Sequence, residues 1–292
     1  MPIHYPDILE QRTEARRFSY GDREVMLYAL SVGLGREPLD ERDLPFVYEK
    51  DLRVLPTAAT VLAASTRGAP LAPLPAGLRV SEINRTLMVH GEQKVALHRP
   101  LPPKGSFIAQ SRVVAVYDKG AGKGAIVINE TAWTDDAGET VATLTNAAFA
   151  RGDGGFGGPA GGPEPPPSRP DRTADLVVEV QTRPDQALLY RLNGDRNPLH
   201  ADPAVAKRAG FERPILHGLC TFGITGWAVL EAVPERNVAL VASHEGRFSA
   251  PVLPGERLAV DLWREGARIW FEARAPERDV VVIRNGLTRL RV

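Results

Sequence analysis

Residues 152–170 read GDGGFGGPAGGPEPPPSRP, a stretch that divides the chain into two parts of similar length. Neither a helix nor a sheet can use this stretch, because glycine loses more backbone entropy than other residues on ordering and proline has no amide hydrogen to donate. Its proline-rich second part is expected to be extended and semi-rigid. We therefore predict a linker at 152–170 that joins an N-terminal domain of residues 1–151 to a C-terminal domain of residues 171–292.

The parts on either side of this linker share a series of landmarks. Tyr28 follows an apolar run that begins near Asp22, and Tyr190 follows a similar run that begins near Asp185. Further along, both parts contain a Pro-Leu pair. This pair is followed by Val-Leu-Pro-Thr in the first part and by Ile-Leu-His-Gly in the second. The distance along the chain from the tyrosine to the last of these leucines agrees within one residue. Three landmarks in one order indicate an internal duplication.

Each part is expected to begin with helices and to continue with strands. A short helix carries the tyrosine, and a longer helix spans residues 58–65 in the first part and 219–233 in the second. The runs that follow are rich in valine, isoleucine and aromatic residues that alternate with polar ones, a pattern typical of antiparallel strands with one buried face. These predicted strands are residues 111–117, 124–133, 140–150, 238–243, 257–264, 268–274 and 279–292. Helix followed by sheet, twice over, predicts the α+β class.

The overall composition argues against several classes of protein. The 292 residues include 36 Lys+Arg and 36 Asp+Glu, and a net charge of zero is unlike a general nucleic-acid binder, which needs a basic surplus. The only cysteine is Cys220, so no intrachain disulfide can form and a reducing compartment is expected. The sequence has no apolar run of about 18 residues and no signal-peptide pattern at its N-terminus. We expect a cytoplasmic protein that binds neither nucleic acid nor membrane.

The densest group of chemically active side chains lies at 190–203, YRLNGDRNPLHADP. Pro198 disfavours helical geometry at the residue before it, so the preceding helix is expected to end close to Asp195. The chain must then turn, and the turn can bring Asp195 and His200 together as a pair for proton transfer. The alternative is that Asp195 caps the turn and that His200 is a buried histidine with no chemical role.

A second group lies at the start of the long apolar helix, where residues 214–221 read PILHGLCT. Free N–H groups at a helix start attract negative charge, and Gly218 lets a ligand oxygen approach closely. These are the properties of an oxyanion site for a polarised carbonyl. The alternative is that Gly218 allows tight packing and that His217 caps the helix. His217 and Cys220 lack a second ligand pair with the spacing of a metal site, so no metal is expected.

Taken together, YRLNGDRNPLHADP (190–203) and GFERPILHGLCTFG (210–223) closely resemble the signature of the MaoC-like dehydratases. Within that family they are most similar to the (R)-specific 2-enoyl-CoA hydratases, which include the hydratase part of peroxisomal multifunctional enzyme type 2. The chain resembles a free-standing, bacterial form, because no fused dehydrogenase or sterol-carrier domain accompanies the hydratase part. Further segments similar to the same family follow along nearly the whole chain, at residues 89–93, 99–102, 116–120, 154–158 and 251–255.

The resemblance implies a double hot dog fold, in which each of two domains wraps an antiparallel sheet around one long helix. It implies reversible hydration of trans-2-enoyl-CoA to (3R)-3-hydroxyacyl-CoA, with the CoA thioester as substrate and no cofactor, and we expect a homodimer. By resemblance, Asp195 and His200 are the catalytic acid/base pair. Asn197 helps to hold the water, and the Gly218 amide binds the thioester oxygen. Further candidates for substrate binding are Glu92, Tyr190, Gly194 and His217.

Other functions are compatible with the same residues. The signature also suits a dehydratase of a steroid-derived, polyketide or branched acyl thioester, because it defines the chemistry better than the shape of the acyl chain. A hot-dog thioesterase would release free CoA thiol, and a non-catalytic acyl-thioester binder would bind tightly without turnover. The sequence does not distinguish a CoA thioester from an acyl-carrier-protein thioester.

The first half lacks counterparts of these chemical groups. Where the second half has Asp195 and His200, residues 34–40 of the first half read LGREPLD and contain no histidine. In place of His217-Gly218 the first half has Pro56-Thr57, and Pro56 has no amide hydrogen. The helix expected next is rich in alanine, and small side chains leave volume beside it. We predict one active site per chain, with the first half shaping the acyl pocket.

Overall fold

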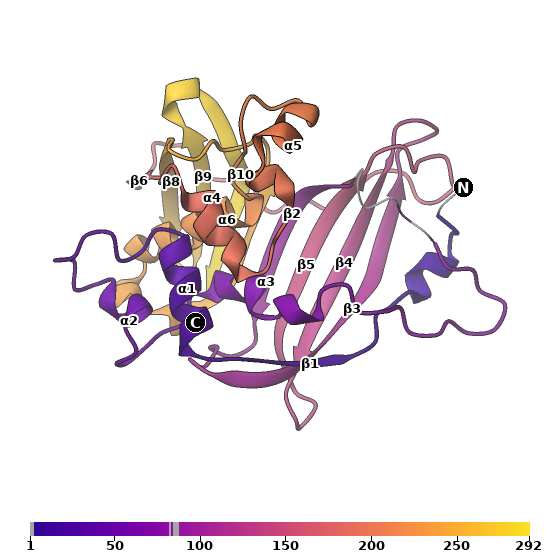
Figure 1. The fold of residues 1–292 in the computed structure, drawn as a ribbon, viewed down its shortest axis with the longest axis horizontal. Coiled ribbons are helices and arrows are strands. Elements are labelled where there is room, and N and C mark those ends of the chain that lie inside the picture. The colour runs from indigo at the N-terminus through magenta and orange to yellow at the C-terminus, as the bar shows by residue number, and fades with distance from the viewer. Residues whose placement is uncertain (1–2, 82, 84–87) are drawn as a thin grey trace.

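The computed structural model describes residues 3–81, 83 and 88–292, and the strands of this part form one antiparallel sheet (Figure 1). The strands of the first half are β1 (Arg16–Tyr20), β2 (Met88–Leu97), β3 (Gly105–Asp118), β4 (Ala125–Thr134) and β5 (Thr140–Ala150). The strands of the second half are β6 (Leu176–Gln181), β7 (Val241–Phe248), β8 (Arg257–Glu265), β9 (Arg268–Ala275) and β10 (Val280–Leu290). Their order across the sheet is β1-β3-β4-β5-β2-β7-β10-β9-β8-β6.

The two halves repeat one topology. Counted from the outer edge, the first half runs β1-β3-β4-β5-β2 and the second runs β6-β8-β9-β10-β7, so each strand has a counterpart at the same place. The halves meet where β2 pairs antiparallel with β7, with Glu92 opposite Arg247 and Ala96 opposite Ser243. This arrangement is what the internal duplication in the sequence predicts.

The helices gather on one face of the sheet (Figure 1). They are α1 (Asp22–Ser31), α2 (Leu44–Val47), α3 (Ala59–Leu62), α4 (Gln186–Tyr190), α5 (Pro203–Arg208) and α6 (Gly218–Ala228). The sequence of α6, GLCTFGITGWA, is apolar on all sides because the helix is buried between the sheet and α1. A Cβ atom on Gly223 would lie 2.6 Å from the Tyr28 hydroxyl, so glycine permits this close packing.

One of the helix predictions is wrong. Residues 58–65 do not form a continuous helix, because only α3 is α-helical and 3₁₀ turns at Pro56–Ala58 and Ala64–Thr66 flank it. No side chain caps the N-terminus of α3, and such a short segment has little intrinsic helical stability. The expected helix at 219–233 is observed as α6 followed by a 3₁₀ turn at Val229–Ala232.

Most predicted strands are present with shifted ends. The run at 140–150 coincides with β5, and the run at 111–117 is the second part of a longer β3. The run at 238–243 begins with a 3₁₀ turn, and its strand continues to Phe248. β1, β2 and β6 are not among the predicted strands.

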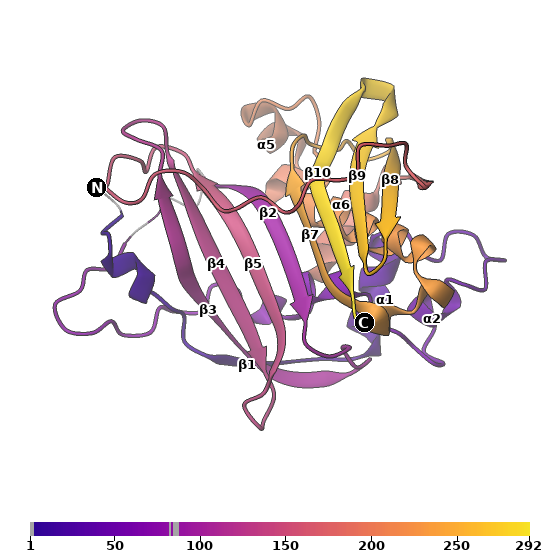
Figure 2. The same cartoon turned by 180° about the vertical axis from the view of Figure 1, so that it is seen from behind.

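The glycine- and proline-rich residues 152–170 contain neither helix nor strand. They cross the face of the sheet opposite the helices (Figure 2). The indole N–H of Trp270 on β9 donates a hydrogen bond to the Pro167 carbonyl, at 3.0 Å, and fixes this crossing to the sheet. No helix within the described ranges is long and apolar enough to span a membrane.

Candidate active site

A tight turn after α4 positions Asp195. The helix ends at Tyr190, a single 3₁₀ turn follows, and Gly194 adopts the left-handed conformation with φ of +106°. A Cβ atom at Gly194 would also lie 2.6 Å from the side chain of Ala64, so both conformation and packing require glycine here. The Asp195 carboxylate then accepts a hydrogen bond from the backbone N–H of Asn197, at 3.1 Å.

The chain turns a second time to return His200 toward Asp195. Asn197 caps the 3₁₀ turn Pro198–His200 by accepting the Leu199 N–H at 3.0 Å. As a result, the Asp195 carboxylate and one ring nitrogen each from His200 and His217 all lie within 4.8 Å of one another. The structure therefore brings together the two side chains that the sequence proposed as a pair, and it adds His217 to them.

Hydrogen bonds to backbone carbonyls fix the orientation of both histidines. Nδ1 of His200 donates to the Ile215 carbonyl at 2.8 Å, so the neutral ring has its lone pair on Nε2. Nε2 of His217 donates to the backbone carbonyl of Asp195 at 3.3 Å. The two imidazole rings stack with centroids 3.7 Å apart. Stacked rings direct their lone pairs side by side and not toward a common point, which is a poor arrangement for two ligands of one metal ion.

Burial keeps both rings neutral. It lowers the pKa of His200, although the Ile215 hydrogen bond and the negative charge of Asp195 act in the opposite direction. Burial also lowers the pKa of His217 to about 4, and the neighbouring His200 adds to this effect. Near neutral pH, His200 is thus an unprotonated imidazole with a carboxylate beside it, which is suited to accept a proton.

The N-terminus of α6 lies directly after His217. Gly218 is the first residue of α6, and its N–H has no hydrogen-bond acceptor in the described part of the chain. The helix adds a partial positive charge at this end. A Cβ atom at Gly218 would lie 3.3 Å from the Phe248 ring, so the absence of a side chain leaves room for a ligand oxygen.

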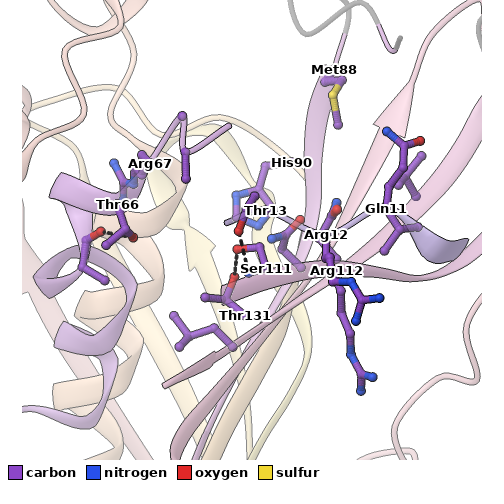
Figure 3. Close-up of a pocket in the computed structure, with 18 of the residues that line it drawn as sticks. Gln11, Arg12, Thr13, Thr66, Arg67, Met88, His90, Ser111, Arg112 and Thr131 are labelled. Atoms are coloured by element: carbon purple, nitrogen blue, oxygen red, sulfur yellow. Dashed lines mark hydrogen bonds between the residues drawn. The ribbon is translucent and has the colours of Figure 1, made fainter. Parts of the chain in front are cut away.

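A cavity of about 570 Å³ lies over the sheet of the first half and reaches Asp195. Figure 3 shows part of its wall, with His90, Ser111 and Thr131 among the labelled residues. Asp195 and Leu219 belong to its wall on the side of the second half. Ala59 and Ala63, from α3 and the residue after it, form part of the wall in the first half. The short α3 and its small side chains thus leave space open beside Asp195.

The other predicted binding residues lie outside the cavity wall. Tyr190 packs its buried ring against His217, with centroids 5.0 Å apart, and its hydroxyl has no partner among the described residues. Gly194 contacts the turn after α3. Tyr190, Gly194 and His217 support the position of Asp195. His217 bonds to its backbone carbonyl, Tyr190 packs against His217, and Gly194 precedes Asp195 in the turn.

Glu92 requires a correction. It lies on the opposite face of the sheet, where its carboxylate is 4.0 Å from the Arg247 guanidinium and burial raises its pKa. A β-bulge at Gly91, where the pairing with β5 shifts by one residue, is the physical reason. Because of the bulge, His90 and Gln93 face the cavity in its place.

His90 and Gln93 belong to the segment 89–93, which is similar to the family, but no role was predicted for either residue. His90 packs edge-on against Phe248 with centroids 5.0 Å apart, and burial lowers its pKa to about 4. The sequence signal for these residues was a polar run interrupted by glycine inside a strand, which is typical of a bulge.

Comparisons with known proteins agree along the whole chain. Residues 18–152 match the model of the MFE-2 hydratase 2 N-terminal domain, and residues 166–285 match that of the MaoC like domain. The chain is 39% identical to enoyl-CoA hydratase ChsH3 of Mycobacterium tuberculosis, over 98% of either chain. It superposes with a TM-score of 0.86 on a MaoC-like dehydratase from Phytophthora capsici, at 32% identity and 99% coverage of both chains.

A third comparison concerns the fold alone. A Mycobacterium tuberculosis protein described as a double hotdog superposes with a TM-score of 0.56 at 14% identity, over 96% of this chain and 94% of that one. Together with the repeated topology and the two family models, this likeness confirms the predicted α+β double hot dog.

Proposed function

The chain belongs to the MaoC-like dehydratase family, and on that premise we propose that it catalyses the reversible hydration of a trans-2-enoyl-CoA to the (3R)-3-hydroxyacyl-CoA. One observation carries this proposal. Asp195, His200 and the free N-terminus of α6 converge beside a cavity large enough for an acyl group.

The acid/base pair moves one proton from water to C2. Hydration adds the hydroxyl of water to C3 and a proton to C2, so the proton that water loses is the proton that C2 gains. In this proposal, the Asp195/His200 pair takes up this proton from water, with Nε2 of His200 free to accept it, and passes it to C2. Asn197 holds the water through its side-chain N–H₂, because its carbonyl oxygen already accepts the Leu199 N–H.

The start of α6 stabilises the charge that develops on the substrate. As water adds to C3, negative charge moves onto the thioester oxygen, as in an enolate. The N–H of Gly218 and the helix terminus behind it supply a donor and a partial positive charge for that oxygen. The loss of one such donor typically costs ~3 kcal/mol of transition-state stabilisation.

Tyr190 and His217 position Asp195 in this proposal. His217 donates to the Asp195 carbonyl, and the Tyr190 ring covers the other side of His217. The expected homodimer, the cytoplasmic location and the expected independence from a cofactor stay predictions.

The size of the cavity favours a second candidate with the same chemistry. A volume of about 570 Å³ is in the range of sites for drug-sized ligands. A steroid-derived, polyketide or branched acyl thioester is therefore a second candidate substrate, and the length of the acyl chain is the variable to test.

The test is to follow the loss of enoyl absorbance with purified protein and trans-2-enoyl-CoAs of graded length, beginning with crotonyl-CoA. We expect turnover to a 3-hydroxyacyl-CoA, and chiral separation of the product should give the R isomer. A folded preparation that leaves the whole panel unchanged would overturn the proposal. Release of free CoA thiol would indicate a thioesterase, and tight binding without turnover would indicate an acyl-thioester binder.

A further inference from the structure

The sheet of the first half forms one wall of the cavity. No long helix covers this wall, because α3 is short. In the second half, α6 covers the corresponding strands, and its Thr225 hydroxyl lies 3.1 Å from Nε2 of His244 on β7. Nδ1 of His244 in turn lies 2.7 Å from the hydroxyl of Thr288, directly opposite on β10. The polar side chains on this face of β7 and β10 therefore have hydrogen-bond partners on α6 or on each other.

In the first half, three carboxamides form a row across adjacent strands. Gln93 on β2 lies directly opposite Asn146 on β5, and Asn146 lies directly opposite Asn129 on β4. All three residues line the cavity. Neighbouring side chains at such positions are about 4.5–5.5 Å apart at Cβ, so the amides form one continuous polar strip.

Two of these amides have no partner of their own. The Gln93 side chain donates to the Lys94 and Thr145 carbonyls, at 2.9 and 3.2 Å. By contrast, within residues 3–81, 83 and 88–292 the side chains of Asn129 and Asn146 form no hydrogen bond. Each carboxamide offers two N–H donors and one carbonyl acceptor.

Hydroxyl groups nearby are already paired with each other. Ser111 on β3 and Thr131 on β4 lie opposite one another with their hydroxyl oxygens 2.7 Å apart, and the Ser111 N–H donates to the Thr13 hydroxyl at 3.0 Å (Figure 3). Unused hydrogen-bonding capacity on this wall therefore lies at the two asparagines and at the buried indole N–H of Trp133, which has no partner among the described residues.

We infer that Asn129 and Asn146 bind an uncharged oxygen substituent, a hydroxyl or a ketone, on the acyl group of the substrate. This assignment rests on the function proposed above. A plain hydrocarbon chain laid over these amides would remove water from them and return no hydrogen bond, which is unfavourable. An oxygen substituent replaces that water and can also accept the unpaired indole N–H of Trp133, while Leu144 and the ring carbons of Trp133 in the same cavity contact the carbon skeleton.

The first test compares substrates on the unmodified enzyme. trans-2-Dodecenoyl-CoA is compared with matched compounds that carry one keto or hydroxyl group at successive positions in the distal half of the chain. The kcat/KM of the best oxygenated compound should exceed that of plain dodecenoyl-CoA by about 10-fold, the effect of one to two hydrogen bonds. Equal or lower kcat/KM for every oxygenated compound would overturn the inference.

The second test uses Asn129→Leu and Asn146→Leu, which keep the side-chain volume and remove the amide. Each should lower the ratio of oxygenated to plain kcat/KM several-fold, and the double variant should abolish the preference. Thr145→Val is the matched control, because Thr145 is next to Asn146 on β5 but lines the opposite face of the sheet. An unchanged ratio in both asparagine variants, or an equal loss in Thr145→Val, would contradict the assignment.

Hydration of crotonyl-CoA distinguishes a failure of this inference from a failure of the proposed function. Its four-carbon acyl group has no distal atoms to reach the asparagines, so its hydration reports the chemistry alone. If crotonyl-CoA is hydrated but the preference is absent, only the inference fails. If neither crotonyl-CoA nor any longer enoyl-CoA is hydrated, the proposed function itself fails.

Discussion

Replacing Asp195 by asparagine preserves the shape of the side chain and its bond to the Asn197 N–H but removes the carboxylate charge. We expect kcat/KM for crotonyl-CoA to fall by about 100- to 10,000-fold while the fold is retained. His200→Ala should behave similarly, and the double variant should be little worse than either single one, because the pair acts as a unit. Steady-state kinetics with circular dichroism as the folding control would decide this. Near-normal turnover by the Asp195→Asn variant would mean that Asp195 only caps the turn.

The pH dependence of activity follows from the environment of His200. Burial lowers the pKa of His200 below the ordinary value of 6.5, and the unprotonated ring is the active form. Activity should therefore persist as the pH falls through 6.5 and decline only at lower pH. A profile of kcat/KM between pH 4.5 and 8 would measure this acid limb. An apparent pKa at or above 6.5 would contradict the proposed state of the ring.

At the scale of single residues, the sequence predicted that Asp195 and His200 lie together but did not predict all of their surroundings. Pro198 and the short spacing from Asp195 to His200 require a turn, and a turn brings the two side chains together whatever the tertiary structure. The position of Glu92 depends on the bulge at Gly91, which reverses the faces of the residues that follow. Strict alternation along the strand predicts the wrong face for that residue.

At the scale of elements, we predict that the segment around α3 determines which acyl groups fit. Ala63→Phe places an aromatic ring on the cavity wall. We expect selective loss of long or bulky substrates, by 10-fold or more, with crotonyl-CoA turnover retained. The matched control is Ser65→Phe, because Ser65 is exposed on the same segment and does not line the cavity. Equal loss at every chain length would show that the segment serves the chemistry and not the acyl pocket.

The elements that sequence patterns failed to predict differ in their physical causes. The central part of β2, HGEQK, is polar on both faces, because one face borders the cavity and the other faces the linker, so no apolar alternation marks it. The alanine-rich segment at 58–65 has high helix propensity, but propensity does not supply caps. By contrast, β5 and α6 each bury much of their surface, and their apolar patterns predicted them well.

At the scale of the whole molecule, the two halves share one core. Tyr28 and Tyr190 belong to the same buried cluster, with ring centroids 6.3 Å apart, and β2 pairs with β7 across the middle of the sheet. We therefore expect one cooperative unfolding transition in urea. Trp133 reports on the first half, and Trp227, Trp263 and Trp270 report on the second. Fluorescence of Trp133→Phe should give the same midpoint as a variant that keeps Trp133 alone, whereas separate midpoints would mean that the halves unfold independently.

The unequal lengths of α3 and α6 have an evolutionary consequence. In an assembly of two identical chains, a substitution that shortens the central helix shortens it in both subunits, and the gain in space at one site is coupled to damage at the other. Joining the two copies in one polypeptide removes that coupling, because each copy mutates alone. In one chain, the copy with α6 can keep the residues proposed for the reaction while the segment around α3 changes to suit other acyl groups.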